Sequence, residues 1–338
     1  MNNKILFMLS DWALKRVSVF NAVIISTLFL SVSAFSATWP VQPVRLVVPV
    51  GPGSTGDTMV RMLAPRLESM WKQPVIVENK PGAGSIVGTE YVINAKDGHT
   101  ILLGTLSSLL PKYTTTNLRY DPAVDLIPIY KIINYETVLF VSEKTGTRVN
   151  TIEDFIEESK NSSDGVFFAG LGPTSIFNMM MRTINNDIGI RYSSVDFNSV
   201  AEMNMALMRD DAQFALNAPS NVKAHIESGK FKPILAIAPK RYKNLPNLPT
   251  VAEAVGYDGY MPISWAGLFG PKNMSQNTVE VIARDINSVL SDPAFRRDLE
   301  QRLGGEILDS SPQIFAKEYA EDLTAWERVV KNLNITPQ

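Results

Sequence analysis

The stretch Pro49-Val50-Gly51-Pro52-Gly53-Ser54-Thr55-Gly56-Asp57 joins an apolar, strand-like run (residues 44–48) to a helical pattern over residues 58–67. Small residues between a strand and a helix let several backbone N–H groups point into one open space, at the positive end of the helix dipole. A second small-residue turn, Pro81-Gly82-Ala83-Gly84-Ser85, follows the next strand-like run, residues 75–77. Two such turns in one domain predict a pocket of backbone donors that suits an anion such as a carboxylate.

A phosphate-binding loop is the main alternative for the first turn. Gly51 and Gly56 have the spacing of the two P-loop glycines, after which Lys and then Ser or Thr should follow. The chain instead has Asp57 and Thr58, and an acidic side chain there would repel phosphate. We therefore expect no nucleotide site, while an ordinary glycine-rich turn capped by Ser54 or Asp57 stays open as the structural interpretation.

Composition excludes several classes of protein. The chain has 338 residues, 45% of them hydrophobic, which is enough for a large core and more naturally two lobes than one. Its 32 Lys and Arg nearly balance 34 Asp and Glu, and no basic block indicates nucleic acid. Without cysteine there is no disulfide, thiol nucleophile or thiolate metal site. His99 and His225 lack partners at a catalytic or metal-binding spacing, so we expect no enzymatic activity, metal or cofactor.

The N-terminus has the order of a secretory signal. Three basic residues precede or border an apolar run over residues 17–32, small residues follow, and no further charged residue comes before Arg45. This order predicts a signal peptide over residues 1–36, cleaved after Ala34 or Ser36, and an exported, periplasmic product. An uncleaved membrane anchor is the alternative, because the run is close to the length that spans a bilayer.

Strand-like and helix-like segments alternate along the remaining chain, which predicts an α/β architecture. A third small-residue turn, Gly170–Ser175, follows a strand in the second half, and residues 239–262 are rich in turn-forming residues and expected to be irregular. The expected strands are residues 44–49, 75–78, 100–104, 126–133, 137–142, 165–169, 212–216, 232–238 and 265–269. The expected helices are residues 58–70, 85–94, 152–161, 176–185, 199–209, 221–228, 276–290 and 312–332.

Longer motifs carry a family resemblance. They are residues 39–49 (WPVQPVRLVVP), 73–84 (QPVIVENKPGAG), 97–104 (DGHTILLG), 120–122 (YDP), 245–254 (LPNLPTVAEA) and 264–267 (SWAG). With these motifs, in this order along essentially the whole mature chain, the sequence resembles the Bug/TctC family of periplasmic solute-binding proteins, the receptors of tripartite tricarboxylate transporters.

The resemblance implies a two-lobed type II periplasmic-binding-protein fold with a discontinuous first lobe. Lobe 1 is expected over residues 37–140 and 264–338, and lobe 2 over residues 141–263. The implied function is capture of a small carboxylate between closing lobes, and its delivery to the membrane permease subunits of a tripartite tricarboxylate transporter. It further implies a monomer without a cofactor or enzymatic activity. A ligand-sensing partner of a signalling system is the alternative function.

The family places its ligand at the strand-end loops. Carried over to this sequence, the ligand-binding residues are Gly53, Ser54, Thr55, Asp57, Gly84, Ser85, Thr105, Ser107, Gly172, Thr174, Ser175, Phe197 and Asn217. For Ser54 and Thr55 the alternative is that they only satisfy the turn. Asp57 has two alternatives to a carboxylate contact: a structural cap, or an acceptor for the ammonium group of an amino-acid ligand.

Departures from the family pattern leave the ligand's identity open. Ser85-Ile86 stands where a glycine and a polar residue are usual, and Phe197-Asn198-Ser199 replaces Tyr-Lys-Gly. Phe177 replaces a common histidine, and Asp210-Asp211 a pair of small residues. A less polar cleft, and hence a less hydrophilic carboxylate such as an aromatic acid, is one consequence.

Overall fold

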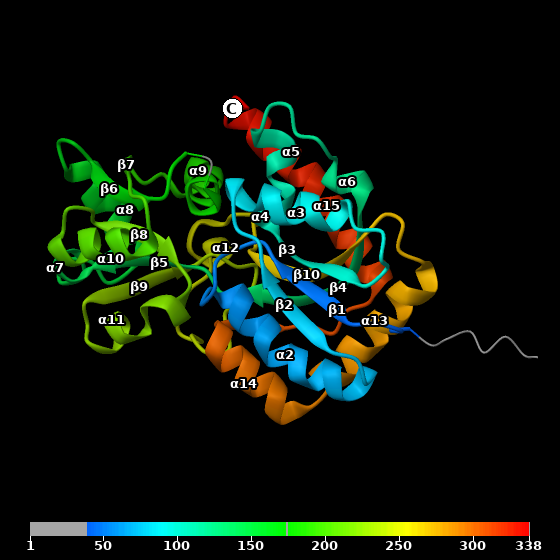
Figure 1. Ribbon diagram of the computed structural model, residues 1–338. Coiled ribbons are helices and arrows are strands. Elements are labelled where there is room, and N and C mark those ends of the chain that lie inside the picture. Colours follow the sequence, from blue (N-terminus) through cyan, green and yellow to red (C-terminus); the bar gives the residue numbers. More distant parts are fainter. Residues whose placement is uncertain (1–38, 174, 338) are drawn as a thin grey trace, which may run out of the picture. The chain divides into compact units, whose positions relative to one another are not determined.

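The computed structural model describes residues 39–173 and 175–337. The predicted signal peptide and Thr174 therefore lie outside the described residues. From Gln42 onward the described chain forms one compact unit with two β-sheets, each flanked by helices (Figure 1). This mixed α/β architecture confirms the predicted fold class.

The six-stranded sheet has the order β11-β4-β10-β3-β1-β2. Strands β1, β2 and β3 are parallel, so their carboxyl ends meet at one edge, whereas β10 runs antiparallel to both β3 and β4. The amino end of β10 and the carboxyl end of β4 therefore reach that same edge. The strands are β1 (Val44–Val48), β2 (Val75–Asn79), β3 (Thr100–Thr105), β4 (Leu126–Tyr135), β10 (Trp265–Pro271) and β11 (Gly305–Ile307).

The helices of this sheet come from both ends of the chain. Long amphipathic patterns at both ends of the sequence supply α2, α13 and α15, whose apolar faces pack toward the sheet. The elements are α2 (Thr55–Trp71), η1 (Ala83–Ser85), α3 (Ile86–Ile93), α4 (Leu106–Leu109), α5 (Pro111–Thr114), α6 (Pro122–Asp125), α13 (Gln276–Leu290), α14 (Pro293–Leu303) and α15 (Pro312–Asn332).

The five-stranded sheet has the order β7-β6-β8-β5-β9. β6 is parallel to β7 and β8, while β5 runs antiparallel to β8 and β9. The strands are β5 (Val138–Ser142), β6 (Val166–Gly170), β7 (Tyr192–Asp196), β8 (Phe214–Asn217) and β9 (Phe231–Ala236). The helices are α7 (Glu143–Gly146), α8 (Ile152–Asn161), α9 (Ile176–Ile188), α10 (Val200–Arg209), η2 (Pro219–Val222), α11 (Lys223–Glu227) and α12 (Val251–Val255).

The chain passes between the two sheets twice. It leaves the first sheet after β4 and enters the second at β5, then returns through residues 237–264 to β10. The first sheet is thus built from both ends of the chain. The expected boundary after residue 140 falls inside β5, all of whose pairs lie in the second sheet.

Each sheet has its own hydrophobic core. Trp265, Phe269, Phe315 and Trp326 are buried in a cluster under the first sheet, and Phe155, Phe168 and Phe214 under the second. Met179 of α9 belongs to the first of these clusters, although its helix follows a strand of the second sheet. The helix containing Met179 therefore contacts both halves of the molecule.

Two elements near the C-terminus were not predicted. Helix α14 has Asp292 as its N-cap, accepting from the amides of Ala294 and Phe295, and Pro293 at its first position. This Asp-Pro start is a recognisable signal, but α14 is highly charged and its apolar periodicity is weak. Strand β11 is three residues long and depends on pairing with β4, which local sequence does not encode.

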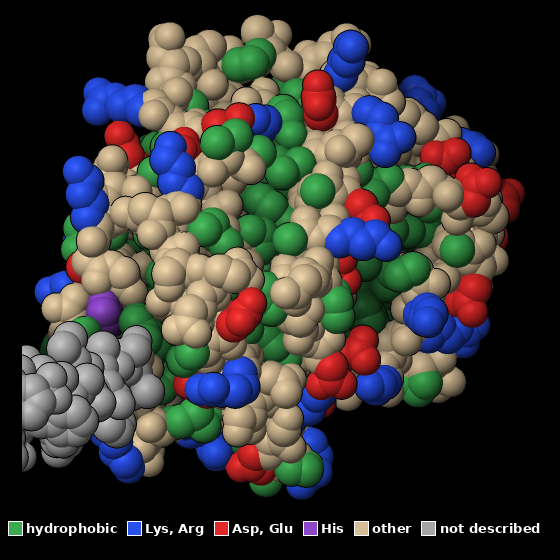
Figure 2. All heavy atoms as spheres, turned by 90° about the vertical axis from the view of Figure 1, so that its right-hand side faces the viewer, with side chains coloured by type: hydrophobic (Ala, Val, Ile, Leu, Met, Phe, Trp, Pro, Cys, Tyr) green, Lys and Arg blue, Asp and Glu red, His purple; other side chains and the backbone are tan. Residues whose placement is uncertain are grey.

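The face of the molecule shown in Figure 2 has no strong charge asymmetry. Lys and Arg side chains alternate with Asp and Glu over this face, as the nearly neutral composition predicts. Among the described residues, none of the helices has the length and apolar character needed to span a bilayer.

Candidate functional site

The first small-residue loop follows β1 and ends in the cap of α2. Ser54 is the N-cap, and its Oγ accepts from the amide of Asp57 at 3.2 Å. Helix α2 therefore begins at Thr55, three residues before its expected start, because the cap extends the helix into the loop. The amides of Thr55 and Gly56 occupy the first helical turn, where a helix provides no acceptor. Neither amide has an acceptor among the described residues.

Asp57 holds this loop in shape. Its Oδ2 accepts from the Gly53 amide at 2.9 Å and its Oδ1 from Asn79 Nδ2 at 2.8 Å, while Arg61 Nε lies 3.0 Å from both oxygens. The side chain is only 3% exposed. Burial would raise its pKa, but hydrogen bonds from Arg61, the Gly53 amide and Asn79, together with the Arg61 charge, lower it from 3.8 to about 2. Asp57 is thus an ionised carboxylate of the first helical turn whose hydrogen bonds are satisfied within the loop.

The second loop has an unusual backbone. Gly82, Ala83, Gly84 and Ser85 all have positive φ angles, of 139°, 44°, 60° and 79°. For the two residues that are not glycine, this conformation costs free energy, and such strain gathers at functional sites. A Cβ atom at Gly88 would lie 2.8 Å from the Lys80 carbonyl oxygen, so Gly88 lets α3 approach the end of β2. The turn is therefore a specialised backbone structure.

The third loop follows β3. Thr105 caps α4, its Oγ1 accepting from the Ser107 amide at 3.2 Å, while Ser108 Oγ accepts from the Thr105 amide at 3.4 Å. Helix α4 contacts η1 of the second loop. Asn79, at the end of β2, binds the Val50 carbonyl of the first loop at 3.1 Å. The first sheet therefore brings the three predicted loops together at one edge.

In the second sheet, Asn178 organises the predicted loop. Its Oδ1 accepts from the Leu171 amide at 2.9 Å and from Ser175 Oγ at 2.7 Å. Its Nδ2 donates to Ser194 Oγ at 3.1 Å and to Asp196 Oδ1 at 2.9 Å. The side chain is 3% exposed, and all four of its hydrogen-bonding positions are used. Sequence analysis missed Asn178; the available signal was its place three residues after the cap Ser175.

The remaining predicted residues lie at the same edge of the second sheet. Asn217 ends β8 and is 2% exposed; its Oδ1 accepts from the Ala218 amide at 2.9 Å and from Asn221 Nδ2 at 3.2 Å. Phe197 follows β7, donates its amide to the Gly170 carbonyl at 2.9 Å, and packs against the core cluster beside α10. Gly172 has a φ of 99°, and no atom of the other described residues lies within 4 Å of where its Cβ would be. The backbone there lies open.

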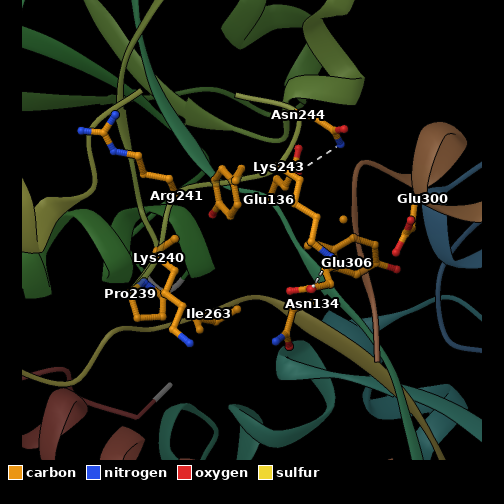
Figure 3. Close-up of a pocket in the computed structure, with 14 residues that line it drawn as sticks. Asn134, Glu136, Pro239, Lys240, Arg241, Lys243, Asn244, Ile263, Glu300 and Glu306 are labelled. Carbon is orange, nitrogen blue, oxygen red and sulfur yellow. Dashed lines mark hydrogen bonds and ion pairs between the residues drawn. The ribbon is translucent and has the colours of Figure 1, made fainter. Parts of the chain in front are cut away.

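A separate cavity lies where the chain crosses between the sheets (Figure 3). Its volume is about 260 Å³, and none of the predicted ligand-binding residues lines it. Lys243 Nζ and Glu306 Oε1, 3.0 Å apart, form an ion pair across it (Figure 3). Because its walls are crossing segments and α14–β11, we assign this cavity to the junction of the lobes and not to the ligand loops.

Glu136 is the buried acid of this junction cavity. It is 6% exposed, and its Oε1 accepts from Asn244 Nδ2 at 3.3 Å (Figure 3). Burial raises its pKa, and the charges of Glu300 and Glu306 raise it further, against the hydrogen bond from Asn244. Within residues 39–173 and 175–337, no group of three or more His, Asp or Glu side chains is arranged to hold a metal ion.

Comparison with known proteins gives a consistent family match. The model of the tripartite tricarboxylate transporter family receptor matches residues 59–335. A UPF0065 protein of Bordetella bronchiseptica is 28% identical over 313 residues, covering 92% of this chain and 91% of that protein. The protein BugT of Bordetella pertussis is 26% identical over 324 residues, covering 91% of this chain and 94% of BugT.

Solved structures agree with the family match. The periplasmic binding protein BugD has a TM-score of 0.73 at 25% identity, covering 89% of this chain and all of BugD. An R. palustris protein solved with adipate has a TM-score of 0.76 at 25% identity, with the same coverage. These matches confirm the predicted two-lobed type II periplasmic-binding-protein fold, and the matched family is one of receptors and not of enzymes.

Proposed function

The chain belongs to the tripartite tricarboxylate transporter receptor family, and on that premise we propose that it captures a small carboxylate between two closing lobes. It then delivers this ligand to a tripartite tricarboxylate-type membrane permease. The observation that carries the proposal is the pair of amides of Thr55 and Gly56, which open the first turn of α2 without an acceptor among the described residues. They lie at the positive end of a seventeen-residue helix, where an anion is stabilised.

The energetics are those of a receptor with backbone donors. A hydrogen bond to a charged group contributes about 1.5–3 kcal/mol net. Micromolar affinity requires about 8 kcal/mol, and association itself costs several kcal/mol. Donors must therefore be held in place before the ligand arrives, and the Asp57 and Asn178 networks each fix one loop in this way. Closure of the lobes would add contacts from the other side and exclude water.

The proposed ligand site consists of the loops that follow the strand ends at one edge of each sheet. Hydroxyl groups of three of its residues, Ser54, Thr105 and Ser175, already cap helices. We therefore assign these three mainly to holding the loops, and the ligand contacts to neighbouring amides. The proposed set is Gly53, Ser54, Thr55, Asp57, Gly84, Ser85, Thr105, Ser107, Gly172, Thr174, Ser175, Phe197 and Asn217, with Asp57 as a loop-forming residue.

Relatives support the ligand class. The R. palustris protein solved with adipate has this fold over nearly the whole chain, and adipate is a small dicarboxylate. The periplasmic location of the family supports export of this chain, with removal of residues 1–36. We further propose that the chain acts as a monomer. We propose two lobes, residues 37–140 with 264–338 and residues 141–263, with the first boundary moved to residue 137 so that all of β5 lies in lobe 2.

Calorimetric titration tests the proposal. The mature protein is titrated with a panel of mono-, di- and tricarboxylates, together with their uncharged amides as matched controls. We expect at least one carboxylate to bind with micromolar affinity and to raise the melting temperature, and its amide to bind at least a hundredfold more weakly. Absence of heat and of a thermal shift with every acid, in protein that mass spectrometry shows to be free of co-purified ligand, would reject the proposal.

A further inference from the structure

The predicted ligand loops carry an unusual balance of charge. They contain no Lys or Arg, although Lys80, which pairs with Glu78, directly precedes the second loop, and two acidic residues lie in or next to the loops, Asp57 and Asp196. Asp57 is neutralised by Arg61 at 3.0 Å and is buried. Asp196 has no ion-pair partner among the described residues and is exposed. Next to Phe197 of the proposed site there is therefore one carboxylate whose charge no ion pair among the described residues compensates.

This carboxylate is held in a fixed position. Asp196 Oδ1 accepts from the buried amide of Asn178 at 2.9 Å and from Ser194 Oγ at 3.0 Å. Asn178 is itself fixed by the Leu171 amide and by Ser175 Oγ. Both hydrogen bonds use one carboxylate oxygen, and Oδ2 has no partner among the described residues. An exposed acceptor held by a buried amide is pre-organised for a ligand donor.

The glycine at position 170 leaves space for the contact between Asn178 and Asp196. Gly170 ends β6 and pairs in register with Asp196 at the end of β7, and β6, β7 and α9 lie in the same part of Figure 1. A Cβ atom at Gly170 would lie 2.5 Å from the amide atoms of Asn178 and 2.5 Å from Asp196 Oδ1. Any side chain at position 170 would therefore displace the pair. The same turn carries Gly172 and Ser175, both in the proposed site.

We propose that Asp196 is a specificity-determining residue that accepts a hydrogen bond from a cationic group of the ligand, so that the ligand is an amino carboxylate. This inference rests on the proposed function. The ligand's carboxylate binds the amides of the first lobe, and its ammonium group binds Asp196 Oδ2 of the second. A dicarboxylate of similar length would place its second negative charge near Asp196, where like charges repel.

Matched ligand pairs test this inference on the unaltered protein. Adipate and 6-aminohexanoate, glutarate and 5-aminopentanoate, and succinate and 4-aminobutyrate have equal carbon counts and differ in one terminal group. We expect the amino acid of the best-binding pair to bind at least tenfold more tightly than its diacid. Tighter binding of the diacid in every pair would overturn the inference and leave the proposed carboxylate receptor intact. If no member of any pair binds, the inference fails together with the proposed function.

A variant identifies the residue responsible. Asp196→Asn keeps an oxygen for Asn178 and Ser194 but removes the charge. We expect it to lower affinity for the amino acid at least tenfold and to raise affinity for the diacid. The control, Asp164→Asn, removes an exposed acid from the turn before β6 and should change neither affinity. An unchanged ratio of the two affinities in a folded Asp196→Asn variant would overturn the assignment, and if that variant does not fold, the ligand pairs still decide.

Discussion

Asp57 and Asp196 are two carboxylates in matching places with different surroundings. Each lies beside a small-residue loop at the carboxyl edge of a parallel strand pair, and each accepts from an asparagine amide, Asn79 at 2.8 Å and Asn178 at 2.9 Å. Asp57 also accepts hydrogen bonds from Arg61 Nε and the Gly53 amide, and it is buried. Among the described residues, the one further donor to Asp196 is the Ser194 hydroxyl, and Asp196 is exposed.

The comparison assigns different roles to the two carboxylates: Asp57 holds a loop in shape, and Asp196 keeps an acceptor oxygen for the ligand. All the acceptor capacity of Asp57 is turned inward, so its carboxylate shapes the first loop and leaves the helix amides to bind an anion. One oxygen of Asp196 binds Asn178 beside the Gly170–Ser175 loop, and the other has no partner among the described residues. The two lobes thus offer opposite chemistry, donors on the first and an acceptor on the second.

The largest expected effect comes from removing the charge of Asp57. Asp57→Asn leaves one acceptor oxygen for three donors, which are the Gly53 amide, Arg61 Nε and Asn79 Nδ2. It also leaves the Arg61 guanidinium without its carboxylate partner. We therefore expect a loss of about 3 kcal/mol in the free energy of unfolding. Asp196→Asn, the matched control on the exposed carboxylate, should stay within about 0.5 kcal/mol. Urea denaturation measures both. Equal losses would remove the distinction between the two carboxylates.

The pH dependence of stability sharpens the same comparison. Because folding lowers the pKa of Asp57 from 3.8 to about 2, its ionised form stabilises the folded state by about 2 kcal/mol. This contribution is complete above about pH 5 and is lost as the pH falls from about 4 to 2. The stability difference between the unaltered protein and Asp57→Asn should shrink over that interval. A difference that stays constant between pH 6 and pH 2.5 would contradict the assigned pKa.

Substitutions at two glycines of the first loop distinguish blocked ligand access from backbone strain. In the part of the chain that the structure describes, a Cβ atom at Gly51 or Gly53 meets nothing within 4 Å, but of the two only Gly53 has a positive φ, of 81°. Gly51→Val should lower ligand affinity at least tenfold with stability unchanged, because its side chain would occupy open space at the first loop. Gly53→Val should also cost about 1–2 kcal/mol of stability, so a Gly53 variant alone cannot leave the fold unaffected.

Gly229→Val is the control for that pair. Gly229 has a φ of 73°, open space around it, and a place between α11 and β9, away from the loops. It should lower stability as Gly53→Val does and leave affinity unchanged. Full ligand affinity in a folded Gly51→Val variant would remove the first loop from the site.

The smallest effect concerns Glu136, a buried carboxylate without a cation partner in the described contacts. Its pKa is raised by burial and by Glu300 and Glu306, so its ionised form destabilises the folded state. Glu136→Gln should raise the melting temperature by a few degrees at pH 8. The gain should vanish as the pH falls below the raised pKa, where Glu136 is protonated. A lower melting temperature at pH 8 would show that the negative charge is stabilising.

The sequence predicted much of the fold because local signals were strong. Apolar runs defined most strands, and the helices expected from residues 152 and 176 begin there, after the N-caps Thr151 and Ser175. The start of α2 was placed three residues late, since Ser54 rather than Asp57 is the cap. Strand β11 was missed because it exists only through its pairing with β4.

The candidate site was predicted less completely, for a physical reason. Spacing located the loops, which follow strand ends. It gave no sign that Asn79 would reach Asp57, or that Asn178 and Asp196 would meet across eighteen positions, because these contacts depend on how β1 pairs with β2 and β6 with β7. The assignment of individual ligand contacts stays a prediction.

A crystal structure of the protein with its tightest-binding carboxylate tests the central claim most directly. We expect the ligand's carboxylate oxygens about 2.7–3.1 Å from the backbone nitrogens of Thr55 and Gly56, beside Gly84 and Ser85. A carboxylate bound instead in the junction cavity near Lys243 and Glu136, with the strand-end loops empty, would contradict the account.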